Sequence, residues 1–221
     1  METGAAALER MTDAQAKVSA HYMVEQDGRI FQMVEEDNRA WHAGVSEWRG
    51  ESNINSASIG IEIVNGGHDW PLPDGSLPPY PDAQIAAVIP LCKAIMSRHN
   101  ISAEGVVGHS DIAPARKKDP GEHFPWAGLA AAGIGRFPLD IEPDRRRLFG
   151  AGSRDRGVSI VQRGLAEIGY CARVTGVLDE DTRLVIAAFQ RRYRPAQVDG
   201  VVDMETMAII RWLVETPREM A

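Results

Sequence analysis

The segment from residue 133 to residue 157, GIGRFPLDIEPDRRRLFGAGSRDRG, divides the chain into two parts. It mixes Gly, Pro, Asp and Arg with little apolar periodicity, which is typical of a linker. A chain of 221 residues is about one and a half times a typical domain, so its length fits one large and one small domain. We therefore predict a domain over residues 1–135, a linker over 136–154 and a second domain over 155–221.

Composition excludes two classes of protein. The 24 Lys and Arg residues against 31 Asp and Glu give a net charge of −7, which lacks the basic footprint of a nucleic-acid binder. No apolar run approaches the about 18 residues that a membrane-spanning helix needs. The first residues, METGAAALER, carry charges where a signal peptide is apolar, so we expect a cytoplasmic protein, or one of the cell envelope or periplasm if a lost N-terminus carried a signal. Cys92 and Cys171 are too few for a disulfide framework and are predicted to be free, buried thiols.

The first part is predicted to be α/β, with a mixed central sheet flanked by helices. Asp27-Gly28 lies between two extended runs, HYMVEQ and RIFQMV, which predicts a β-hairpin. The run IGIEIV over residues 59–64 predicts a buried strand whose only charged residue is Glu62.

A helix is predicted to follow Asp82, its expected N-cap, because apolar residues then recur at helical spacing. Pro90 lies inside this pattern and is expected to kink or shorten the helix. Val106-Val107 is predicted to be a short strand, followed by loop through Pro125.

The last part contains an internal repeat that predicts a small all-α, three-helix module. GVLDEDT at residues 176–182 is echoed by GVVDMET at residues 200–206. In each copy the Asp, Asp179 or Asp203, is placed to cap a following helix. A preceding helix carries apolar residues at helical spacing between Val158 and Ile168.

The densest polar segments are GHSD, which contains His109, and KKDPG, which contains Lys117 and Asp119. Imidazole and carboxylate are both zinc ligands, and a catalytic zinc takes three protein groups and a water. From the residues alone, however, a structural hydrogen bond between His109 and Asp119 is the more common arrangement. Glu62 strengthens the functional hypothesis, because a carboxylate on an apolar strand must meet a partner or open onto a cleft. A strand-end salt bridge is the alternative for Glu62.

Five ordered motifs resemble one family. SAHYMV-x2-DG-RIFQMV, AWHAG, SIGIEIVN, GHSDIAPARKKDPG and FPW resemble the zinc-dependent N-acetylmuramoyl-L-alanine amidases of the bacterial type-2 amidase family, which is related to peptidoglycan-recognition proteins. This resemblance covers roughly residues 1–135. The C-terminal repeats resemble the three-helix peptidoglycan-binding module that is often fused to cell-wall hydrolases. The partner implied is peptidoglycan or a muropeptide fragment of it.

The resemblance implies a role for individual residues. His109 and Asp119 match two of three zinc ligands, Glu62 matches the catalytic carboxylate, and Lys117 matches the lysine that stabilises the tetrahedral intermediate. His42, in AWHAG, resembles a residue of the cleft wall. Tyr22 stands where some relatives have a catalytic tyrosine. His21, in contrast, is expected to be a packed structural histidine.

The third zinc ligand of the family is a histidine at the end of a first strand, in a segment resembling LHYTG. This sequence begins after that segment, so the third ligand is expected upstream of Met1 and the chain as given is expected to bind zinc weakly. Two alternatives to an active amidase therefore stay open: an inactive truncated form, and a non-catalytic peptidoglycan-binding protein of the same fold.

Overall fold

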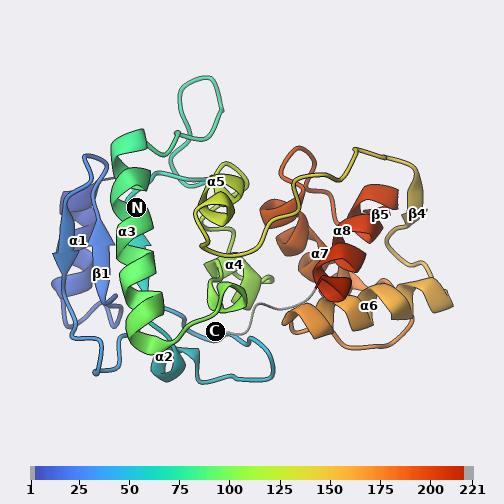
Figure 1. The fold of residues 1–221 in the computed structure, drawn as a ribbon, viewed down its shortest axis with the longest axis horizontal. Helices are drawn as coiled ribbons and strands as arrows, with labels where there is room; N and C mark the ends of the chain where they lie inside the picture. Colours follow the sequence, from blue (N-terminus) through green and yellow to red (C-terminus); the bar gives the residue numbers. More distant parts are fainter. Residues whose placement is uncertain (1–2, 217–221) are drawn as a thin grey trace.

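The computed structural model describes residues 3–216 and shows an N-terminal domain beside a C-terminal module (Figure 1). The N-terminal domain contains α1 to α5, β1 to β3 and one short 3₁₀ helix, η1; the module contains β4, β5 and α6 to α8. The elements of the N-terminal domain are α1 (Gly4–Thr12), β1 (Tyr22–Val24), β2 (Ile30–Gln32), α2 (Ile54–Ala57), β3 (Ile61–Ile63), α3 (Asp82–His99), η1 (Ala103–Gly105), α4 (His109–Ile112) and α5 (Trp126–Ala131).

Three short strands form a mixed sheet in the order β2-β1-β3. β1 is antiparallel to β2, with Met23 opposite Phe31, and parallel to β3, with Met23 opposite Glu62. Gly28 turns the hairpin at a φ of 88°, where a side chain would be strained. The predicted hairpin is confirmed, and so is a strand around Glu62, although β3 covers only Ile61–Ile63 and is half-buried rather than buried.

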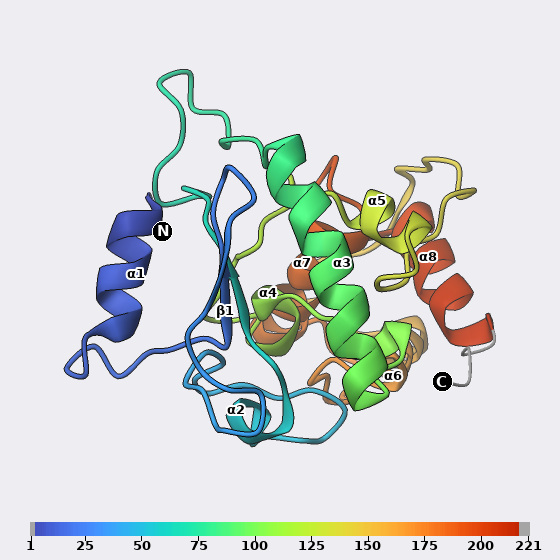
Figure 2. The ribbon, with the colours of Figure 1, turned by 60° about the vertical axis from the view of Figure 1, so that its left-hand side comes forward.

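Helices α1 and α3 lie on opposite sides of this sheet (Figure 2). Met11 of α1 belongs to the same apolar cluster as Met23, whereas Val88 of α3 belongs to the cluster of Val24. Successive side chains of a strand point to opposite faces, so neighbouring residues of β1 serve two separate cores. The predicted fold class, a mixed sheet flanked by helices, is confirmed.

Helix α3 differs from its prediction at Asp82, and of the two effects expected of Pro90, a kink or a shorter helix, only the second is tested. Pro81 occupies the N-cap position and Asp82 lies in the first turn. A carboxylate in the first turn still stabilises the helix, because it interacts favourably with the positive end of the helix dipole. The helix continues through Pro90 to His99, so the proline does not shorten it.

The predicted strand at Val106-Val107 is wrong. The preceding residues form η1, and Val106 N–H donates to the carbonyl of Ala103 rather than to a neighbouring strand. The two valines instead pack against two different apolar clusters, which accounts for their apolar character without sheet pairing. The stretch predicted as loop also contains α4, which begins at His109.

The module packs α6 (Arg156–Ile168), α7 (Glu180–Tyr193) and α8 (Met204–Glu215) around a single apolar cluster. The Asp179 side chain accepts a hydrogen bond from Thr182 N–H, and the Asp203 side chain accepts one from Thr206 N–H. Both predicted caps are therefore confirmed. The structure adds a small antiparallel ribbon to the three predicted helices, formed by β4 (Arg147–Phe149) and β5 (Val202–Asp203).

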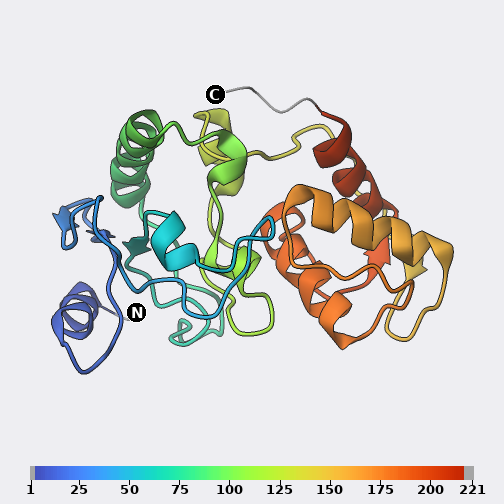
Figure 3. The same ribbon diagram turned by 90° about the horizontal axis from the view of Figure 1, so that it is seen from below.

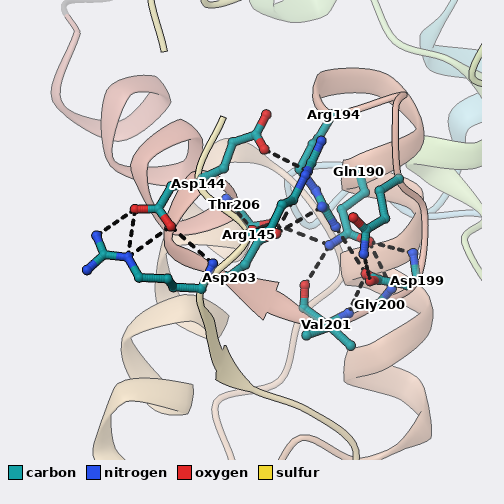
Figure 4. A network of polar contacts seen from close by, with 12 residues as sticks. Asp144, Arg145, Gln190, Arg194, Asp199, Gly200, Val201, Asp203 and Thr206 are labelled. Atoms are coloured by element: carbon teal, nitrogen blue, oxygen red, sulfur yellow. Dashed lines mark hydrogen bonds and ion pairs between the residues drawn. The ribbon is translucent and has the colours of Figure 1, made fainter. Parts of the chain in front are cut away.

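Arg194 carries a fully buried charge in this module (Figure 4). Its guanidinium lies 2.9 Å from Asp203 and 3.0 Å from Asp199. Arg145, which belongs to the segment predicted as linker, lies 2.6 Å from Glu205. The end of that segment is therefore attached to the module, although the exact domain boundaries stay predictions.

Two further expectations concern the whole chain. Over the described residues, no helix is both long and apolar enough to cross a membrane. Cys92 and Cys171 are both free, but only Cys92 is buried. The prediction of burial is wrong for Cys171, which lies just beyond Tyr170, where the chain leaves the module's core.

Candidate active site

His109 and Asp119, the two predicted ligands, come together at the start of α4. His109 is the first residue of that helix, and its Nδ1 lies 2.9 Å from Oδ2 of Asp119 in the loop that follows. The N–H of Ser110 donates to the carbonyl of Asp119 at 2.8 Å. This backbone contact fixes the loop to the helix, so the side chains of His109 and Asp119 keep a fixed position relative to each other.

The contacts of Nε2 of His109 bear on whether Nδ1 carries a hydrogen or a lone pair. Nε2 lies 3.1 Å from the carbonyl oxygen of Ala43 and 3.4 Å from the guanidinium of Arg116, which itself donates to that carbonyl. With a hydrogen on Nδ1, the contact with Asp119 is a hydrogen bond. With the hydrogen on Nε2, both facing atoms carry lone pairs and can hold a metal cation between them. A backbone carbonyl that orients a histidine in this way is typical of metal sites, and the donor pair suits zinc.

The described residues supply only this pair. Between residues 3 and 216, no group of three or more His, Cys, Asp or Glu side chains is arranged to hold a metal ion. A catalytic zinc takes three protein ligands. His109 and Asp119 thus fit two of those positions.

Glu62 lies on β3, and its pKa is affected by the charges of the residues around His109 and Asp119. Burial raises the pKa of Glu62, the negative charge of Asp119 raises it further, and the positive charges of His109 and Lys117 lower it. All four side chains are therefore within electrostatic reach of one another. A carboxyl group whose pKa is raised toward neutrality is suited to exchange protons with a substrate or a water molecule.

Lys117 and Lys118 differ in exposure. Lys117 is half-buried and Lys118 is exposed. The pKa of Asp119 is lowered although burial opposes this, because the hydrogen bond with His109 and the charges of His109 and Lys117 outweigh burial. The ammonium group that acts on both carboxylates is that of Lys117.

His42 lies against the backbone beside β3. A Cβ atom on Gly60 would lie only 2.3 Å from the His42 ring, so this glycine allows the close approach. Burial lowers the pKa of His42 to about 4, and the neighbouring His21 contributes. His21 is packed as predicted, since Gly60 N–H donates to its Nδ1 and its Nε2 contacts the carbonyl of Asn38. His42 thus lies beside the site as a neutral ring.

Tyr22 is not brought into this cluster. Its hydroxyl donates to Glu36 at 2.6 Å, in a group that also contains Arg98 and His99. Burial and this contact raise the pKa of Tyr22. The structure places no contact between this hydroxyl and His109 or Asp119, and a catalytic role for Tyr22 stays an untested prediction.

Two residues that sequence reasoning missed hold the loops of the site. Arg116 donates to the carbonyls of Ala43 and Val45, at 2.7 and 3.0 Å, and so fixes the segment that contacts His109. Tyr80 donates to the carbonyl of Pro120 at 2.9 Å, directly after Asp119. Both contacts are made to backbone carbonyls, which leave no signal in a sequence pattern. The only available signal was the position of Arg116 between the two predicted ligands.

An imidazole, two carboxylates and a lysine gathered at one end of a mixed sheet are the groups of a hydrolase that activates water. The chain belongs to the N-acetylmuramoyl-L-alanine amidase family, whose family model matches residues 1–122. A second model, for a peptidoglycan binding domain, matches residues 154–210. The resemblance seen in the sequence motifs is thereby confirmed for both parts, and the chain is an amidase that carries a peptidoglycan-binding domain.

Named relatives agree with this family. The N-acetylmuramoyl-L-alanine amidase AmiD of Escherichia coli is 41% identical over 218 residues, which cover 94% of this chain and 77% of AmiD. The 1,6-anhydro-N-acetylmuramyl-L-alanine amidase AmpD of Haemophilus influenzae is 41% identical over 113 residues, which cover 51% of this chain and 56% of AmpD. The match to AmiD therefore includes both domains, whereas the match to AmpD spans about half of each chain.

Solved structures show the same architecture. A complex of Escherichia coli AmiD with the substrate anhydro-N-acetylmuramic acid-L-Ala-D-γ-Glu-L-Lys superposes with a TM-score of 0.83 at 37% identity, covering 96% of this chain and 84% of AmiD. AmpDh3 of Pseudomonas aeruginosa gives a TM-score of 0.80 at 35% identity, covering 96% and 87%. The fold of the whole described chain, with both domains, is thus shared with these proteins.

Proposed function

We propose that this chain hydrolyses the amide bond between N-acetylmuramic acid and L-alanine in peptidoglycan or its fragments, with zinc held by His109 and Asp119. The third ligand stays a prediction, placed by the family resemblance upstream of Met1. The observation that supports the proposal most directly is that two atoms able to bind zinc, His109 Nδ1 and Asp119 Oδ2, face each other at 2.9 Å. AmiD and AmpDh3 have been solved with anhydromuramyl peptides, which makes these fragments the first substrates to test.

Zinc at this pair would supply a Lewis acid that polarises the amide carbonyl and activates water. The other steps fall to the chain's own side chains. Glu62 takes the proton from the attacking water, as its raised pKa allows, and passes it to the alanine nitrogen when the C–N bond breaks. Lys117 places a positive charge near the carbonyl oxygen, where negative charge develops. The products are a lactyl carboxylate and a free α-amine on L-alanine.

The C-terminal module would bind the polymer and raise the local concentration of substrate. Its match to a peptidoglycan binding domain supports this role. A tether accelerates hydrolysis of polymer but adds nothing to hydrolysis of a small soluble fragment. Comparing hydrolysis of the polymer with hydrolysis of the soluble fragment therefore separates the contribution of the module as a tether from that of the active site.

The test is hydrolysis of anhydro-N-acetylmuramyl-tripeptide, with release of the peptide followed by mass spectrometry. The 221-residue chain is compared with a chain extended at Met1 by a strand ending in histidine, each with zinc and with a chelator. We expect zinc-dependent cleavage by the extended chain and little cleavage by the 221-residue chain. Glu62→Gln should lower turnover by about 10²–10⁴-fold, whereas the exposed Glu35→Gln should not change it.

Two results would contradict the proposal. Cleavage that persists unchanged in Glu62→Gln would remove this residue from the chemistry. Binding of purified peptidoglycan by a zinc-loaded extended chain that cleaves neither polymer nor fragment would instead indicate the non-catalytic binding protein.

A further inference from the structure

The carboxylate of Asp111 is buried between the two domains, with 1% of the residue exposed. Within its own domain it accepts a hydrogen bond from Gly108 N–H at 2.8 Å. From the module it accepts one from the Tyr170 hydroxyl at 2.6 Å and one from the Arg192 guanidinium at 2.8 Å. Two of these three donors therefore belong to the other domain.

Asp111 is placed to hold His109 from both sides. It lies two residues after His109 on α4, and the N–H that it binds belongs to Gly108, the residue immediately before His109. A side chain that reaches back to the N-cap N–H fixes the first turn of a helix. The first turn of α4 carries the imidazole of His109. Figure 3 shows α4 on the side of its domain that faces the module.

The two donors of the module are themselves held firmly. The Arg192 guanidinium stacks on the ring of Trp126 in α5, 4.0 Å from its centroid, and so reaches into the amidase domain. The Tyr170 ring packs edge-on against Trp48 with centroids 5.1 Å apart. Beside it, Arg49 N–H donates to the carbonyl of Gly169 at 2.8 Å. The donors thus approach Asp111 in one fixed geometry.

A second contact reaches the segment of the other ligand. Arg191, the neighbour of Arg192 on α7, lies 3.6 Å from the carboxylate of Glu122, three residues after Asp119. Glu122 also contacts His68 at 3.1 Å. Adjacent arginines of one helix therefore contact both ligand-bearing segments of the amidase domain.

We propose that the C-terminal module is part of the active-site scaffold, with Tyr170 and Arg192 as positioning residues that fix the imidazole of His109 through Asp111. This inference rests on the proposed function for the role of His109 as a ligand. Removing a donor leaves the buried carboxylate undercompensated, and a buried charge that has lost its partner is strongly destabilising. The turn of α4 relieves that cost by moving, which displaces His109.

The test uses the full chain extended at Met1 by a strand ending in histidine, as for the proposed function, and measures zinc affinity by competition with a chromophoric chelator. Tyr170→Phe removes only the hydroxyl, and Arg192→Lys keeps the charge but loses the planar fork. We expect both to weaken zinc binding by about 10-fold, the lower end of the range for residues that support a ligand. The matched controls are Tyr193→Phe in the same module and Arg211→Lys on the exposed face of α8. Neither control should change the affinity.

Kinetics on the soluble anhydromuramyl tripeptide at saturating zinc give the second readout. Because tethering does not affect a soluble substrate, we expect Tyr170→Phe to lower kcat and leave KM and pelleting with peptidoglycan unchanged. Unchanged zinc affinity and kcat in both Tyr170→Phe and Arg192→Lys would overturn the inference and leave the proposed function intact. If the extended chain without any of these substitutions does not cleave the fragment, the proposed function fails, and the zinc affinities still decide the positioning role.

Discussion

Two sets of buried charges, one inside the module and one between the two domains, are paired in different ways. In the module, Arg194 finds Asp199 and Asp203 within nine residues of its own position in the sequence. In the amidase domain, Asp111 takes donors from Tyr170 and Arg192, which are 59 and 81 residues away in the other domain. Arg194 is therefore paired within its own domain, whereas Arg192 of the module and Asp111 of the amidase domain are paired only with each other's domain. The apolar cores repeat the contrast, with one cluster in the module and smaller separate clusters around the sheet.

The largest effect should come from the module's buried charge. We expect Arg194→Met to lower the free energy of unfolding of the module by about 3–5 kcal/mol, because Asp203 and Asp199 lose their shared partner. Arg183→Met, which breaks a solvent-exposed pair with Glu180, should cost less than about 1 kcal/mol. Urea denaturation followed by circular dichroism measures both values. Equal losses in the two variants would show that the buried pair is not what holds the module together.

The next effect concerns the chemistry of the amidase domain. Lys117→Met should lower kcat by about 10²–10³-fold, the cost of losing one group that stabilises developing negative charge. Lys118→Met, the exposed neighbour, should retain wild-type turnover. Both are measured on the soluble fragment with the zinc-loaded enzyme. A larger loss of kcat in Lys118→Met than in Lys117→Met would show that Lys118, and not Lys117, stabilises the developing negative charge.

A smaller effect should appear in the pH dependence of stability. The pKa of His42 is lowered to about 4 by burial and by His21, whereas an unfolded histidine titrates near about 6.5. The unfolded chain therefore binds the proton first, and this contribution to stability is complete above about pH 6.5 and is lost as the pH falls toward 4. The loss should not exceed about 3.5 kcal/mol. A His42→Asn variant whose unfolding free energy keeps the wild-type pH slope in this range would contradict the assignment.

The sequence predicted the features that depend on neighbouring residues. Asp179 and Asp203 cap helices because capping is decided within three residues, and Asp27-Gly28 turns a hairpin because the turn itself demands a glycine at positive φ. Glu62 could be singled out because a carboxylate is conspicuous in an apolar run. The juxtaposition of His109 and Asp119 was predicted because one short loop connects them.

The features it missed depend on contacts between distant residues. Nothing near Asp111 in the sequence indicates that Tyr170 and Arg192 will meet it, since domain docking has no periodic pattern. Val106-Val107 has the composition of a strand, but strand formation needs a pairing partner, and the two valines are half-buried without one. Tyr22 could not be placed from the sequence, because its environment is set by Glu36 and Arg98, which belong to other segments.

We expect His109 and Asp119 to bind the metal and Glu62 to serve the chemistry. A zinc titration compares the extended chain with its Asp119→Ala and Glu62→Gln variants, read by competition with a chromophoric chelator. Asp119→Ala should lose zinc binding, because a charged ligand is removed, and Glu62→Gln should bind zinc as the unsubstituted chain does. Equal zinc affinity in the unsubstituted chain and Asp119→Ala would contradict this expectation.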